Sequence, residues 1–307
     1  MSDPSSIEAG TLFRVDGIVA AITGGGTGIG LMMARALLRN GAKQVFILGR
    51  RFDVLQAAAD ANPGLTPIQC DITSKASLQS AVDTITSSVG HLNLLVVNSG
   101  IGGTPARYAA NPSSTSISEL RRQLFTDHSL EDFTNIFAVN VSGAFFTMMA
   151  FLELLDEGNT NASFGGYGGM SDAVGKAVSA VQSQIVVTSS ISAYVRGSMT
   201  PPSYGASKAA VLHLAKQASS QLAGYGIRVN ALAPGLFPSD LAAPMIGDRK
   251  PNEEAFEDPR FIPARRFGGE EEMAGMILYL ASRAGSFCNG LVLVADGGRL
   301  GVMTSSY

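Results

Sequence analysis

The sequence predicts a single-domain α/β fold in which helices cover both faces of a doubly wound, seven-stranded parallel sheet. Short apolar runs alternate along the chain with amphipathic segments of helical period, and most of these runs are apolar at nearly every position. Strands that are apolar on both sides are typical of a parallel sheet covered by helices. The chain has 307 residues, 46% of them hydrophobic, which is enough to bury one large core.

The expected strands and helices follow one another in regular order. The strand-like runs are 17–22, 44–48, 66–70, 92–97, 184–189, 227–233 and 291–295. The amphipathic segments between them include 29–39, 74–89, 131–155 and 206–224. Alternation of strand and helix from the first run onward indicates a doubly wound sheet. No internal repeat or linker divides the chain, so residues 1–307 are expected to form one domain.

Two segments interrupt this alternation. Residues 156–183 are rich in Gly, Ser and Asn and are longer than an ordinary connection, so we expect a surface insertion there. Residues 241–268 are charged and broken by prolines, and they follow the sixth expected strand at an edge where substrate clefts form. This second segment is either a substrate lid or a solvated excursion.

Composition excludes several classes of function. A net charge of -3 leaves no basic stripe for nucleic acid. Cys70 and Cys288 are too few for a disulfide framework, fit a reducing compartment and are interpreted as packing residues. His91, His128 and His213 lack ligand spacing, so no metal site is expected. The N-terminus is polar, without a secretory signal, and no apolar run looks long enough to span a bilayer; we therefore expect a cytosolic protein with no membrane partner.

The loop "TGGGTGIG", residues 23–30, joins the first expected strand to the first long helix. Glycines there permit positive φ and let backbone N–H groups and the helix N-terminus approach a pyrophosphate. Ile29 occupies the place of the third glycine of G-x-G-x-x-G, so the register that fits is G-x-x-x-G-x-G, with Gly24, Gly28 and Gly30. The alternative is a tight turn that holds no ligand.

This register, with a threonine before it, resembles the short-chain dehydrogenase/reductase family. Further motifs extend the resemblance from about residue 15 to about residue 300: "CDIT", "VVNSGIG", "FAVNVSGAF", "TSSISA", "YGASK", "APGLFPSD", "IPARRFGGEEEMAGMILYLAS" and "NGLVLVADGG". The resemblance implies a Rossmann fold that binds a nicotinamide dinucleotide. The departures are the 156–183 insertion and one extra residue between the active serine and Tyr204.

The resemblance also assigns residues to the cofactor. Asp71 corresponds to the aspartate that contacts adenine, Ser99 replaces the usual alanine, and Ser239 replaces a threonine that contacts the carboxamide. The full implied set is Thr23, Gly24, Thr27, Gly28, Ile29, Gly30, Arg50, Arg51, Asp71, Ile72, Asn98, Ser99, Gly100, Tyr204, Lys208, Pro234, Gly235, Leu236 and Ser239.

The end of the second expected strand, "FILGRRFD", favours NADP(H). A carboxylate at this point binds the ribose 2′-OH of NAD, whereas an arginine accommodates the 2′-phosphate of NADP. Gly49 occupies the acidic position, Arg50 and Arg51 follow, and Asp53 comes too late. Guanidinium groups match phosphate geometry. The alternative is a solvated turn that happens to carry two arginines.

Tyr204 and Lys208 are spaced i, i+4, so on a helix both project from one face. A phenol titrates at about pH 10, and a nearby ammonium together with an oxidised nicotinamide would lower that pKa. The alternative is an exposed tyrosine and a solvated lysine. The resemblance implies that Tyr204 is the general acid/base and that Lys208 orients the ribose and lowers the tyrosine pKa. It also implies that Ser190, chosen over Ser189 and Ser192, positions the substrate carbonyl.

Asn140 resembles the fourth catalytic residue of the family, whose backbone carbonyl holds a water that relays protons; the alternative is helix bending or packing. The complete set implies NADPH-dependent, reversible reduction of a ketone or aldehyde. A nucleotide-binding member with a non-redox role, such as cyclisation, or with a regulatory or structural role is the alternative, and the intact set argues against it. The family commonly forms homodimers and homotetramers, so we expect one of these.

The expected substrate pocket is mostly apolar. Its candidate residues are Ile101, Gly102 and Phe237, with the segments 194–203 and 241–262. No convergent basic cluster for a CoA phosphate is evident, which favours an uncharged ketone or aldehyde.

Overall fold

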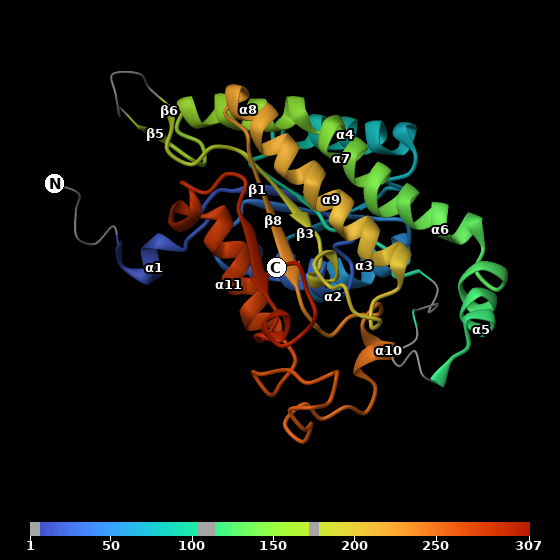
Figure 1. The fold of residues 1–307 in the computed structure, drawn as a ribbon. Coiled ribbons are helices and arrows are strands. Elements are labelled where there is room, and N and C mark those ends of the chain that lie inside the picture. The colour runs from blue at the N-terminus through green and yellow to red at the C-terminus, as the bar shows by residue number, and fades with distance from the viewer. Residues whose placement is uncertain (1–6, 104–107, 109–113, 172–177) are drawn as a thin grey trace.

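A seven-stranded parallel sheet lies between two layers of helices (Figure 1). The computed structural model describes residues 7–103, 108, 114–171 and 178–307. The strand order is β3-β2-β1-β4-β7-β8-β9, and every neighbouring pair is parallel. The strands are β1 (Val19–Thr23), β2 (Gln44–Gly49), β3 (Leu65–Gln69), β4 (Leu94–Val97), β7 (Gln184–Thr188), β8 (Arg228–Pro234) and β9 (Val292–Ala295). The predicted doubly wound sheet is confirmed, and each strand lies within two residues of its expected ends.

Each face of the sheet has its own hydrophobic core. Along β1, Val19 and Ala21 face one core while Ala20 and Ile22 face the other, so every position of the strand is buried. This explains why the strands are apolar throughout. One core is covered by α4 (Lys75–Ser88), α7 (Ala144–Ala150), α8 (Leu152–Ser163) and α9 (Pro202–Gln221), the other by α2 (Gly28–Arg39), α3 (Phe52–Ala61) and α11 (Glu270–Ala281).

The remaining elements are short. They are the helices α1 (Ala9–Leu12), α5 (Ile117–Arg121), α6 (Leu130–Phe137) and α10 (Ala243–Ile246), the π-helical turns η3 (Arg122–Thr126) and η4 (Ala138–Gly143), and the 3₁₀ turns η6 (Ile191–Ala193), η7 (Ala223–Tyr225), η8 (Arg283–Gly285) and η9 (Arg299–Gly301).

The expected helix 131–155 is one helical rod, α6–η4–α7, followed by α8. Within Leu130–Ala150 an 18-residue window has a mean hydropathy of 1.3, so the stretch is long and apolar enough to cross a membrane by length and composition alone. The expectation that no apolar run reaches that length was therefore wrong. A core helix of a soluble protein passes the same test, and this one packs against α4 and α9.

The expected insertion 156–183 begins as the second half of α8 and continues into a small antiparallel pair, β5 (Met170–Ser171) and β6 (Val178–Ser179). Residues 172–177 lie outside the described part of the chain. The Tyr167 hydroxyl donates a hydrogen bond to the Ala281 carbonyl, which ties this segment to the end of α11. The segment 241–268 contains α10 and a series of turns, with Phe261 and Ile262 buried.

Candidate active site

The glycine-rich loop runs from β1 to the first turn of α2. Gly24 and Gly28 have φ of +65° and +52°, which an L side chain rarely adopts. A Cβ on Gly30 would lie 2.2 Å from the Gly24 carbonyl oxygen, so only glycine fits there. Thr27 precedes the helix without a side-chain capping bond, which leaves the first-turn N–H groups available for an anion. The loop is therefore shaped as a cradle for a phosphate group.

The loop after β4 is fastened to this cradle. The Thr23 hydroxyl is buried and accepts hydrogen bonds from the backbone N–H groups of Asn98 (2.9 Å) and Ser99 (3.1 Å). Asn98 Nδ2 in turn donates to the carbonyls of Thr23 (3.0 Å) and Gly24 (3.3 Å). Thr23 thus supports the cofactor site from inside the protein. Asn98 Oδ1 is buried without a hydrogen-bond partner in the described chain, an acceptor that a bound molecule could satisfy.

The adenosine side of the expected site lies at the ends of β2 and β3. Asp71 Oδ1 accepts hydrogen bonds from the Thr73 N–H (2.9 Å) and hydroxyl (2.7 Å), which lower the pKa of the Asp71 carboxyl; the Arg50 charge lowers it further. Ile72 is buried beside it. The Arg51 guanidinium forms an exposed ion pair with Asp240, 3.5 Å apart. Both arginines therefore lie at the carboxyl end of β2, Arg50 near Asp71 and Arg51 beside the loop after β8.

Lys208 is buried in the middle of the site. Its Nζ donates to the Thr188 carbonyl at the end of β7 (3.0 Å), and burial lowers its pKa to about 8. Tyr204 lies one turn earlier on α9, with its ring centroid 5.8 Å from the Lys208 Nζ. The helix thus presents both side chains to the same region, as the i, i+4 spacing predicts.

Burial raises the pKa of the Tyr204 phenol, and hydrogen bonding with the Ser190 side chain lowers it only in part. The net shift in the described chain is therefore upward, whereas the sequence predicts that an ammonium and an oxidised nicotinamide together lower the phenol pKa. A raised pKa keeps the phenol protonated at neutral pH, the form that donates a proton.

The three serines after β7 have different partners. Ser189 Oγ is buried and donates to the Lys208 carbonyl (2.8 Å), so it braces the helix. Ser190 Oγ accepts from the Ser192 N–H (3.1 Å) and interacts with Tyr204. This arrangement puts the Ser190 hydroxyl, rather than that of Ser189, beside the phenol.

Asn140 lies in the π-helical turn η4, a kind of turn that is frequent at functional sites. Its Oδ1 accepts from the Ile101 N–H (2.8 Å), and its Nδ2 donates to the Ile101 carbonyl (3.0 Å) and to Ser207 Oγ (3.0 Å). The side-chain amide therefore holds the loop after β4 against α9, and it positions neighbouring groups rather than facing the pocket.

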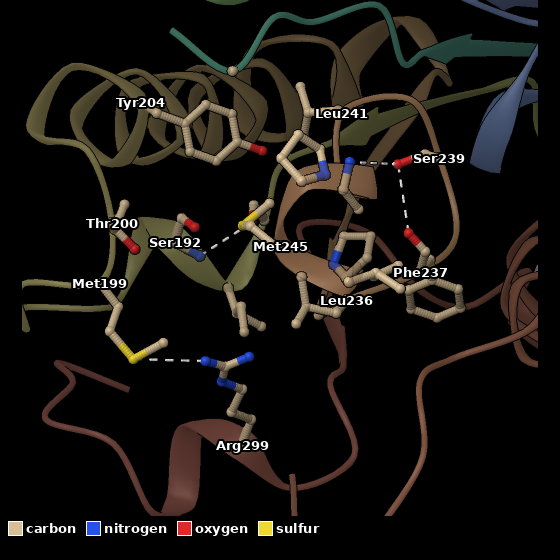
Figure 2. Close-up of a pocket in the computed structure, with 18 of the residues that line it drawn as sticks. Ser192, Met199, Thr200, Tyr204, Leu236, Phe237, Ser239, Leu241, Met245 and Arg299 are labelled. Atoms are coloured by element: carbon tan, nitrogen blue, oxygen red, sulfur yellow. Dashed lines mark hydrogen bonds between the residues drawn. The ribbon is translucent and has the colours of Figure 1, made fainter. Parts of the chain in front are cut away.

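A pocket of about 700 Å³ opens beside Tyr204 at the carboxyl ends of β7 and β8 (Figure 2). Ser190, Ser192 and Tyr204 line its polar end, and Ile29, Gly235 and Ser239 connect it to the expected cofactor site. The loop after β8 crosses the glycine cradle, since a Cβ on Gly28 would lie 2.9 Å from the Ser239 Cβ. Part of the segment 241–268 forms one wall: Leu241, Ala242, Pro244, Met245, Ile246, Gly247, Asp248, Arg249 and Arg260.

Sequence reasoning found part of this pocket. Gly102 and Phe237 line it as expected, whereas Ile101 does not. Arg299 and Met303 were missed, although Arg299 directly follows the "DGG" after β9, at the edge where parallel strands gather their carboxyl ends. Three arginines, Arg249, Arg260 and Arg299, also line the pocket; Arg249 is paired with Glu254 and Arg260 with Asp258.

The residues present fit a nicotinamide dinucleotide: a glycine cradle, an open helix N-terminus and a pocket that begins at the same loop. By contrast, no group of three or more His, Cys, Asp or Glu side chains that could hold a metal comes together within the described ranges. Fold and site together define an oxidoreductase of the Rossmann class.

Comparison with known proteins agrees. The family model for short chain dehydrogenases matches residues 18–250. The short-chain dehydrogenase/reductase SAT3 of Stachybotrys chartarum is 58% identical over 276 residues, which cover 90% of this chain and 100% of SAT3. The chain belongs to the short-chain dehydrogenase/reductase family.

Solved structures of similar fold differ in their cofactor. An NADP complex of RhlG from Pseudomonas aeruginosa has a TM-score of 0.71 and 27% identity, covering 94% of this chain and 98% of RhlG. The 3-ketoacyl-(acyl-carrier-protein) reductase of Brucella melitensis, complexed with NADH, has a TM-score of 0.71 and 26% identity, covering 93% of this chain and 99% of that one.

Proposed function

We propose that this chain reduces a ketone or an aldehyde to an alcohol, reversibly, with NADPH. The observation that carries the proposal is the meeting of the Ser190 hydroxyl and the Tyr204 phenol at one end of a pocket, with the Nζ of the buried Lys208 5.8 Å from the Tyr204 ring centroid. That pocket begins at the glycine cradle, so a substrate in it would lie next to a dinucleotide.

The bound nicotinamide would supply a hydride to the carbonyl carbon. Ser190 donates a hydrogen bond to the carbonyl oxygen and stabilises its developing negative charge. Tyr204, held protonated by burial, transfers its proton to that oxygen. Lys208 is fixed by its bond to Thr188, and in its charged form it stabilises the tyrosinate that remains. The oxidation of an alcohol uses the same groups in reverse.

The choice of NADP(H) rests on the end of β2. Gly49 offers no carboxylate to repel a 2′-phosphate, and Arg50 and Arg51 follow it at the rim. The ion pair between Arg51 and Asp240 is exposed, so it costs little to exchange for a phosphate. This exchange would make two charge-assisted contacts available to the cofactor.

The test is the oxidation of NADPH, followed by its absorbance, against a panel of ketones and aldehydes, with Tyr204→Phe as the matched variant. We expect turnover by the wild type and almost none by the variant. Tight NADPH binding without turnover of any carbonyl would instead favour the non-redox alternative.

We also propose that the protein works as a cytosolic homodimer or homotetramer. Phe145 and Phe146 on α7 are each 37% exposed, and the Lys75 ammonium lies 4.3 Å from the Phe146 ring centroid. Exposed neighbouring aromatic side chains are suited to a subunit interface. Sedimentation of the purified protein tests this, and a monomer at micromolar concentration would contradict it.

A further inference from the structure

Arg299 lies in a fixed position at one end of the pocket, and Tyr204 lies at the opposite end (Figure 2). Both carboxylate oxygens of Asp296 accept backbone hydrogen bonds, from the N–H groups of Gly298 (2.8 Å) and Leu300 (2.7 Å). The tight turn that they hold sets the direction in which the Arg299 side chain leaves η9. The residue is only 5% exposed, yet it lines the pocket.

Within the described residues, the hydrogen-bond partners of the Arg299 guanidinium are two thioether sulfurs. Its Nε lies 3.3 Å from the Met303 Sδ, and its Nη2 lies 3.7 Å from the Met199 Sδ. A thioether is a weak acceptor and carries no charge. Within the described chain, no carboxylate lies at ion-pair distance from this guanidinium. A buried cation without an anion is costly, which makes an anion from outside the chain a favourable partner.

The other two arginines that line the pocket differ. Arg249 is partly buried, with its side chain 11% exposed, but Glu254 accepts from its Nε (2.7 Å) and Nη2 (2.9 Å) and neutralises it. Arg260 is paired with Asp258, and its side chain is 54% exposed. Arg299 alone among these three lining arginines combines burial with the lack of an ion-pair partner. Burial and the nearby Arg249 charge lower its pKa, and the carboxylates of Glu254, Asp296 and Asp258, which are not at ion-pair distance, raise it in part. An arginine still carries its charge at neutral pH.

We propose that Arg299 binds a carboxylate of the substrate, and that the substrate is therefore a keto acid or an aldehyde acid. A guanidinium matches a carboxylate with two parallel hydrogen bonds. The space between Arg299 and Tyr204 is bordered by Met199, Leu236 and Met245, with Ser192 and Thr200 nearer Tyr204 (Figure 2). A mainly apolar spacer would therefore separate the carboxylate from the reacting carbonyl. The position of the reacting carbonyl rests on the proposed function. The substrate class differs from the uncharged one that the sequence favours.

The test compares methyl keto acids of increasing chain length with the methyl ester of each acid, which removes the charge and keeps the carbonyl. For the wild type we expect kcat/KM to be about 10- to 100-fold higher for the best acid than for its ester, the size typical of a charged hydrogen bond. Arg299→Met should abolish that preference by raising KM for the acid. Arg299→Lys should keep part of the preference.

Arg260→Met is the matched control, because it removes a charge from the same pocket but from an arginine already paired with Asp258. The preference for the acid should survive in this variant. Equal loss in Arg260→Met and Arg299→Met would mean that the pocket attracts anions only through its overall charge, and would overturn the role of Arg299.

A binding measurement separates this inference from the proposed reaction. Calorimetry of acid and ester with the enzyme–NADP⁺ complex should show acid binding at least about 10-fold tighter, and Arg299→Met should remove the difference. If the acid binds more tightly and Arg299→Met removes the difference, but no carbonyl is reduced, the carboxylate site is supported and the reductase proposal is refuted. Reduction of ketones with equal binding of acid and ester overturns the carboxylate site alone. Equal binding without any turnover overturns both.

Discussion

Removing both arginines at the end of β2 should convert a preference for NADPH into indifference between the two cofactors. A charge-assisted hydrogen bond contributes about 1.5–3 kcal/mol. The Arg51 side chain is 65% exposed, which favours the low end of that range, and its ion pair with Asp240 offsets at most about 1 kcal/mol. Two contacts at the low end of that range, minus this offset, give the cofactor 2′-phosphate a net binding contribution of about 2–3 kcal/mol. Arg50→Ala/Arg51→Ala should therefore lower kcat/KM for NADPH by about 30- to 150-fold and hardly change that for NADH.

The assay is kcat/KM for both cofactors with one carbonyl substrate. Arg266→Ala is the control, because Arg266 is similarly exposed and paired, with Glu272, but does not lie at the end of β2. Its cofactor preference should equal that of the wild type. A wild type that already prefers NADH, or a double variant that loses both cofactors equally, would refute the reasoning.

Three further predictions follow from single contacts. Gly30→Ala places a Cβ 2.2 Å from the Gly24 carbonyl and should weaken NADPH binding at least about tenfold, measured by fluorescence titration; unchanged binding would contradict the cradle. Asn140→Ala leaves the Ile101 N–H and carbonyl without the Asn140 side chain and removes one of two hydrogen bonds of the Ser207 hydroxyl. It should lower the free energy of unfolding by about 2–4 kcal/mol in urea, whereas a change below about 0.5 kcal/mol would contradict the positioning role. Lys208 has a pKa of about 8 when folded, below its ordinary value of 10.5, so between these values the unfolded chain binds more protons and stability rises with pH. Lys208→Met should lack that rise, and identical pH dependence in both proteins would show that the lysine is not desolvated.

The strands could be predicted from the sequence because they are buried on both faces, so that each strand is an unbroken run of mostly apolar residues. Val19 to Thr23 shows this, with every position buried. The glycine register was also predictable, since Gly24 and Gly28 have positive φ and Gly30 has no room for a Cβ. Such requirements of the backbone determine the residue type at each position and can therefore be recognised in the sequence.

Features that depend on distant contacts left no such signal. The π-helical turn around Asn140 interrupts an apolar helical pattern, and the bonds of that side chain reach to Ile101 and Ser207. Arg299 lies far from Tyr204 along the sequence, and only the fold brings them to one pocket. Arg249 is neutralised because the loop that carries Glu254 brings its carboxylate to the guanidinium, and the sequence spacing of the two residues does not predict this contact.

The central claim, that Tyr204 donates the proton, is tested most directly by Tyr204→Phe, which keeps the ring and removes only the hydroxyl. The measurement is the rate of NADPH oxidation with a carbonyl substrate at saturation, alongside the Kd for NADPH. General acid catalysis contributes about 100-fold or more, so the rate should fall at least that far while the Kd stays within about threefold. A purified Tyr204→Phe protein that turns over at close to the wild-type rate would contradict the account.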